Sequence, residues 1–159
     1  MKLFGKIILV TLFVTSLFSA YNPLDGVKAQ KAEALKYAKK VINVKELNNW
    51  IKDGKDFEIV DVREMKEILA GQISYKKTLN IPRGVLYGAV KKGTLKPKKV
   101  YVLVCRTGHR ALLAAATLIK YYKFENVYVL KGGLKAWIQN GGIIKNGMHL
   151  GDIKVTLLK

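Results

Sequence analysis

The sequence is poor in the residues that cross-link small domains and bind metals. Its 159 residues include one cysteine, two histidines and three prolines. A single cysteine excludes a disulfide within the chain, and so few sulfur and imidazole ligands argue against a zinc centre. Acidic residues are also few, 11 against 29 basic ones, which gives a net charge of +18. We therefore expect no metal, and a positive field that attracts small anions or an acidic partner.

Arginine is scarce among the basic residues. The chain has 4 arginines and 25 lysines, and the lysines are scattered rather than arranged in an aromatic–basic stripe. Proteins that recognise nucleic acids favour arginine, because its planar fork makes bidentate contacts. The composition therefore predicts a solvated basic surface and no nucleic-acid partner.

Long apolar runs are confined to the beginning of the chain. Residues 7–18 are apolar except for two threonines and a serine, which is shorter than the ~20 residues of a spanning helix. Pro23 and Gly26 are then expected to break any helix. We predict a signal peptide over residues 1–29, cleaved after Ala29, with an uncleaved anchor as the alternative. In either case the domain is exported to the periplasm or another extracytoplasmic compartment, and only this segment meets the membrane.

After a polar lead at residues 30–40, apolar runs alternate with helical patterns. Predicted strands cover 41–44, 57–62, 78–82, 99–104 and 126–130, and predicted helices cover 45–54, 63–71, 84–93, 110–122 and 132–142. Such alternation predicts one α/β domain at 41–142 with a mostly parallel sheet. Residues 143–159 form a tail that adds an edge strand or covers a partner chain, for instance in a homodimer.

The cysteine stands at the end of the most continuous apolar strand, where a short polar loop begins. Cys105 is followed by Arg106, Thr107, Gly108, His109 and Arg110, and then by a buried helical pattern. Ligands in parallel sheets bind at the carboxyl ends of strands, and the helix start and the arginines favour a thiolate over a thiol. The alternative is a small hydrophobic residue at a strand end. Reactivity further requires a sulfur that solvent can reach.

The loop length distinguishes between two anion-binding chemistries. Arg110 follows Cys105 by five positions, whereas the loop of tyrosine phosphatases places its arginine six positions after the cysteine. Ala111 occupies that position here. The loop is therefore one residue too short for a phosphate-binding ring.

Four stretches together resemble a known family. "CRTGHR" resembles the active-site loop of single-domain rhodaneses, and it is accompanied in order by "DVRE" at 61–64, "GQISYKKTLNIP" at 71–82 and "GGLKAW" at 132–137. The resemblance covers about 41–142. It departs from the family at Gln72, where histidine is frequent, at the lysine pair 76–77, and at Ala111, where serine is frequent. The predicted export segment makes the chain similar to extracytoplasmic rhodaneses, some of which handle polysulfide.

The resemblance implies a rhodanese-like three-layer α/β fold and a sulfurtransferase. Cys105 would take sulfur from thiosulfate or polysulfide as a persulfide and pass it to a thiol or protein acceptor, without a cofactor. The loop residues 106–110 would bind the anionic donor. Asp61 and Arg63 would brace the pocket, while Asp61 and Glu64 have the spacing of a helix cap. The alternatives are a non-catalytic sulfur carrier that supplies a membrane-bound partner, and a phosphatase or arsenate reductase.

Overall fold

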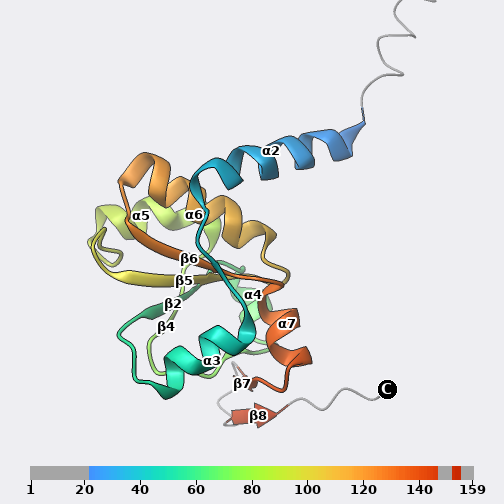
Figure 1. Ribbon diagram of the computed structural model, residues 1–159, viewed down its shortest axis with the longest axis vertical. Helices are drawn as coiled ribbons and strands as arrows, with labels where there is room; N and C mark the ends of the chain where they lie inside the picture. The colour runs from blue at the N-terminus through green and yellow to red at the C-terminus, as the bar shows by residue number, and fades with distance from the viewer. Residues whose placement is uncertain (1–21, 147–151, 155–159) are drawn as a thin grey trace, which may run out of the picture. The chain divides into compact units, whose positions relative to one another are not determined.

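The computed structural model describes residues 22–146 and 152–154 (Figure 1). Residues 1–21 of the predicted signal segment thus lie outside the described residues. Helix α2 (Pro23–Tyr37) begins at the proline, as a helix start tolerates, but Gly26 lies inside it instead of ending it. Among the residues that the structure describes, no helix is long and apolar enough to cross a membrane.

Five parallel strands form the central sheet. In spatial order they are β1 (Val41–Ile42), β6 (Asn126–Leu130), β5 (Val100–Val104), β2 (Glu58–Asp61) and β4 (Thr78–Asn80). Because all neighbouring pairs are parallel, their carboxyl ends meet at one edge of the sheet. This arrangement confirms the predicted α/β class and its parallel sheet.

Helices cover both faces of this sheet (Figure 1). The turn η1 (Arg83–Val85), helix α5 (Leu86–Lys91) and helix α6 (His109–Tyr122) lie on one side, and α3 (Val44–Lys52) and α7 (Gly133–Gln139) on the other. In β5, Tyr101 and Leu103 join the core beneath α6, while Val102 and Val104 join the core beneath α3 and α7. Alternate side chains therefore serve two cores, which explains the unbroken apolar run of β5.

A small antiparallel sheet lies apart from the central one. It pairs β3 (Gln72–Ile73) with β7 (Ile143–Lys145), and β7 with β8 (Asp152–Lys154). The Trp137 indole N–H donates to the carbonyl of Ile143 over 2.9 Å and connects α7 to this sheet. The described part of the predicted tail is thus built into the fold, with β8 as an edge strand.

Candidate active site

The site is built where β5 ends and α6 begins. Cys105 continues the alternation of Tyr101 and Leu103, so its side chain turns toward the α6 core. Gly108 closes the loop in a left-handed conformation, with φ of 93°, and its N–H lies 3.1 Å from the Cys105 sulfur. A backbone donor at the start of a 14-residue helix therefore faces the sulfur, and such a donor stabilises an anion there.

The sulfur lies deeper than the sequence analysis required. Cys105 is 1% exposed, whereas Arg106 and Thr107 in the same loop are exposed. The reason is the strand phase, which directs the cysteine into the core before the loop turns over it. The expectation of an open sulfur is therefore wrong for this conformation. A ligand can react with the sulfur only through a narrow terminal group or after the loop has moved.

The start of helix α7 holds the cysteine loop through backbone hydrogen bonds. The N–H of Leu134 donates to the carbonyl of Cys105 over 2.8 Å, and that of Lys135 donates to the carbonyl of Arg106 over 3.0 Å. The approach is so close that a Cβ at Gly133 would lie 2.3 Å from the Cys105 carbonyl oxygen and 2.8 Å from the Gly108 nitrogen. The second glycine of the pair, Gly133, is therefore required by contact with the loop, whereas a Cβ at Gly132 would meet Ala136 of α7 itself.

Asp61 and Arg63 form a buried ion pair at the end of β2. Nε and Nη2 of Arg63 donate to the Asp61 carboxylate over 2.7–3.0 Å, and Nη2 also donates to the carbonyl of Gly71. Both residues are at most 4% exposed. The pair connects β2 to the segment before β3, so these residues lie where a bracing role requires. Asp61 is not a helix cap.

Arg110 is engaged by a carboxylate that the sequence analysis did not select. Its Nη1 and Nη2 each donate over 2.7 Å to one oxygen of Glu67, in the short helix α4 (Met65–Ile68). These hydrogen bonds hold the pKa of the Glu67 carboxyl at about 2, against an ordinary 4.5. The pKa of Arg110 is raised by the same hydrogen bonds.

A signal for Glu67 was present in the composition. Asp61, Glu64 and Glu67 are three of the 11 acidic residues in a chain of net charge +18, yet they fall within seven positions. Glu67 also accepts the backbone N–H of Glu64 over 3.1 Å, so it supplies the helix-start contact that we expected from Asp61. The sequence thus showed an acidic cluster, but not its proximity to the cysteine loop, which lies some 40 positions later in the chain.

Two cavities flank the cysteine loop. The larger, which we call the arginine cavity, has a volume of about 520 Å³ and is lined by Arg63, Glu67, Arg106, Leu134, Lys135 and Ile138, among others. Arg106 makes no ion pair within the described part of the chain and is exposed. The arginine cavity thus combines apolar α7 side chains with a cation that remains available for a ligand.

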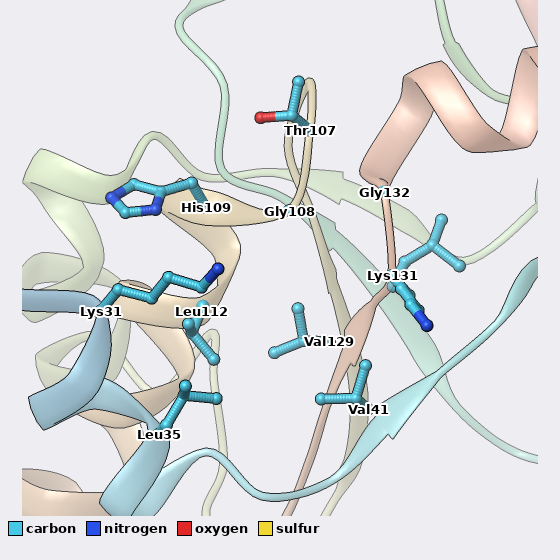
Figure 2. Close-up of a pocket in the computed structure, with 11 residues that line it drawn as sticks. Lys31, Leu35, Val41, Thr107, Gly108, His109, Leu112, Val129, Lys131 and Gly132 are labelled. Atoms are coloured by element: carbon cyan, nitrogen blue, oxygen red, sulfur yellow. The ribbon is translucent and has the colours of Figure 1, made fainter. Parts of the chain in front are cut away.

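The smaller cavity, which we call the lysine cavity, is lined by other residues of the loop than the arginine cavity (Figure 2). It measures about 220 Å³, and Thr107, Gly108 and His109 form its wall on the loop side. Figure 2 shows the Lys31 side chain between His109 and Leu112, with Val129 of β6 and Val41 of β1 to one side. The structure therefore separates the predicted loop residues: His109 faces the lysine cavity and Arg106 the arginine cavity.

Comparison with known families agrees with this architecture. The family model described as rhodanese-like domain matches residues 43–140, well over half of the chain. The chain belongs to the rhodanese-like domain family. The predicted family resemblance is thereby confirmed, together with its fold.

Individual relatives place this rhodanese-like domain among proteins of several descriptions. A probable adenylyltransferase/sulfurtransferase, MoeZ, of Mycobacterium tuberculosis is 30% identical over 74% of the chain, which spans 29% of that protein. The polysulfide-sulfur transferase homodimer of Wolinella succinogenes is 29% identical, with a TM-score of 0.61 over 79% of this chain and 88% of that one. A Rhodopseudomonas palustris protein described as a possible tyrosine phosphatase is 29% identical, with a TM-score of 0.65 over 75% and 93%.

Proposed function

We propose that the protein is a sulfurtransferase that moves a sulfane sulfur from a small anionic donor, thiosulfate or polysulfide, to a thiophilic acceptor. The family and the sulfurtransferase relatives support sulfur transfer in general. The observation that carries the proposal is the contact between Gly108 N–H and the Cys105 sulfur, 3.1 Å long, at the start of α6. A cysteine at that position is a nucleophile whose anion meets a preformed donor.

The reaction proceeds in two displacements on one sulfur atom. The Cys105 thiolate attacks the outer sulfur of the donor, the enzyme S–S bond forms, and the donor S–S bond breaks. Sulfite, or a polysulfide one sulfur shorter, leaves with the electron pair. A thiolate or cyanide then attacks the outer sulfur of the persulfide and returns Cys105 to the thiolate. Arg106, exposed on the arginine cavity, is the cation that receives the donor.

A second candidate, a stoichiometric sulfur carrier, is favoured by the burial of the cysteine. A residue that is 1% exposed is expected to exchange sulfur slowly with dissolved molecules, and a docked protein partner could open the loop. The phosphatase alternative agrees with the description of one relative, but the loop of this chain is one residue shorter than phosphate binding by tyrosine phosphatases requires.

The location of the protein and its oligomeric state are also proposals. We propose an exported, periplasmic or otherwise extracytoplasmic protein, on the strength of the apolar run at residues 7–18 behind two lysines. We also propose a homodimer, because the Wolinella relative is one and β8 is an edge strand of its sheet. Sedimentation of the purified protein would test the dimer.

One experiment separates the candidates. The full chain and Cys105→Ser are incubated with thiosulfate or polysulfide, with and without cyanide, and thiocyanate and intact mass are measured. Turnover on either donor that disappears in Cys105→Ser supports the enzyme. A gain of one sulfur atom in mass without turnover supports the carrier. Neither turnover nor sulfur loading would contradict both, and release of phosphate from an aryl phosphate would instead favour the phosphatase.

A further inference from the structure

The two arginines of the cysteine loop have different surroundings. Arg110 is held by both oxygens of Glu67, at 2.7 Å each, and is one-third exposed. Arg106 is exposed and makes no ion pair with any residue that the structure describes. The charge of Arg106 is therefore available to a ligand, whereas that of Arg110 is already paired with Glu67.

The Glu67 carboxylate lies where three parts of the site meet. The carboxylate accepts hydrogen bonds from the Arg110 side chain and from the backbone N–H of Glu64. The backbone carbonyl of Glu67 accepts a further one from Nη1 of the buried Arg63 over 3.3 Å. Glu67 also lines the arginine cavity. Because a bidentate arginine–carboxylate pair fixes orientation as well as distance, Glu67 determines where the start of α6 lies relative to α4.

The start of α6 in turn determines the surroundings of the sulfur. Arg110 is the second residue of α6 and stands two positions after Gly108, whose N–H contacts the Cys105 sulfur. A shift of this turn would move that donor, and small misplacements of catalytic groups are costly. Released from Glu67, Arg110 would also be free to enter the arginine cavity beside Arg106.

We propose that Glu67 is a positioning residue: its bridge to Arg110 holds the end of the cysteine loop in place and leaves Arg106 as the cation that meets the donor. This inference rests on the proposed sulfurtransferase function. It assigns catalytic geometry to one arginine and donor attraction to the other, which separates effects on kcat from effects on KM.

The test uses steady-state kinetics of the full chain with thiosulfate or polysulfide and cyanide. Glu67→Gln and Arg110→Gln should each lower kcat about tenfold with KM within about twofold, and the double variant should lower kcat no further. Arg110→Lys should resemble Arg110→Gln, because an ammonium cannot replace the fork. Arg106→Gln should raise the KM for the sulfur donor about tenfold and leave kcat within about twofold.

Glu64→Gln is the matched control for the loss of one negative charge. Glu64 lies three positions before Glu67, is exposed, and makes no ion pair with the described residues. The Glu64→Gln variant should leave kcat and the KM for the sulfur donor within about twofold, since an exposed charge is screened by solvent. Losses that multiply in the double variant, or a KM that rises in Glu67→Gln as it does in Arg106→Gln, would overturn the proposal.

Alkylation of Cys105 by iodoacetamide gives a readout that does not depend on sulfur transfer. If the bridge holds the loop over the buried sulfur, alkylation should accelerate several-fold in Glu67→Gln, in Arg110→Gln and equally in the double variant, but not in Arg106→Gln. This pattern in a chain without sulfur-transfer activity would refute the proposed function and retain the positioning role. Unchanged alkylation in the folded single variants would refute the positioning role itself.

Discussion

The two cavities beside the cysteine loop differ in how their cations are held. In the arginine cavity, Arg63 is bound to Asp61 by three hydrogen bonds, while Arg106 and Lys135 make no ion pair with the described residues. In the lysine cavity, Lys31 and Lys131 make no ion pair with any residue that the structure describes. The first cavity therefore contains one planar fork that is fixed and one, Arg106, that is free, whereas the second carries only lysine point charges.

This difference shows how a chain with few arginines uses them. Three of its four arginines belong to the loop or to the buried pair beside it, while 25 lysines supply most of the net charge of +18. Arginine therefore serves where geometry matters, and lysine provides a general field. The comparison predicts that changes on the arginine side alter the site, whereas changes on the lysine side alter little.

The largest expected effect comes from Gly133, which lies in the chain between a residue of each cavity and contacts the cysteine loop. Gly132 lines the lysine cavity, Leu134 lines the arginine cavity, and Gly133 between them has φ of 59°. Gly133→Ala should destabilise the fold by about 3 kcal/mol or more, since its Cβ would meet the Cys105 carbonyl oxygen at 2.3 Å. Urea unfolding followed by circular dichroism measures this loss.

Gly141→Ala is the control for backbone strain alone. Gly141 has a similar φ of 73°, but a Cβ there has nothing within 4 Å. It should cost about 1 kcal/mol, the penalty of a left-handed conformation. If the two variants lost the same free energy of unfolding, close contact between α7 and the loop would not be the reason for the glycine.

A smaller effect should follow from protonating the Glu67 bridge. Its folded-state pKa of about 2 lies below the ordinary 4.5, so its stabilisation is complete above about pH 4.5 and is lost as the pH falls toward 2. The shift corresponds to about 3 kcal/mol for a shielded pair, which solvent screening reduces to about 1–2 kcal/mol because the Glu67 side chain is 27% exposed.

Urea unfolding at pH 6 and pH 3 measures this contribution. Glu67→Gln should lose less stability than the unmodified chain over this interval, because it has no bridge to protonate. Glu64→Gln should retain the full dependence, since its carboxylate makes no ion pair with the described residues. Identical pH dependence in Glu67→Gln and the unmodified chain would mean that the bridge does not contribute to folding.

The sequence was sufficient for the features that depend on chain order. Apolar alternation predicted all five strands of the central sheet, and the position of Cys105 after the β5 run predicted its place at the carboxyl edge. The partner of Arg110 was missed because Glu67 lies 43 positions away and the pairing exists only after folding. The burial of Cys105 was missed because the loop was expected to leave the sulfur open, although the alternation of Tyr101 and Leu103 already directs the side chain into the core beneath α6.

Strand β3 was missed for a related reason. β3 has two residues and pairs with β7, which lies some 70 positions later in the chain. Unlike the equally short β1, which lies in the run 41–44, β3 has no apolar run around it, so only the tertiary pairing makes this segment a strand. Gly26 shows the converse, since helix α2 continues through a residue that was expected to end it.

The smallest expected effect tests the lysine side directly. Lys31→Gln combined with Lys131→Gln removes two positive charges, whereas Arg106→Gln removes one. If the general field attracted the donor, the lysine pair would raise the donor KM more. Because flexible exposed charges are screened within a Debye length of about 8–10 Å, we instead expect less than a twofold change from the pair. Initial rates at low and high salt measure the donor KM of the lysine-pair variant and of Arg106→Gln. The increase in donor KM caused by Arg106→Gln should become smaller as the salt concentration rises. A lysine-pair defect as large as that of Arg106→Gln would place donor binding in the lysine cavity and reverse the comparison.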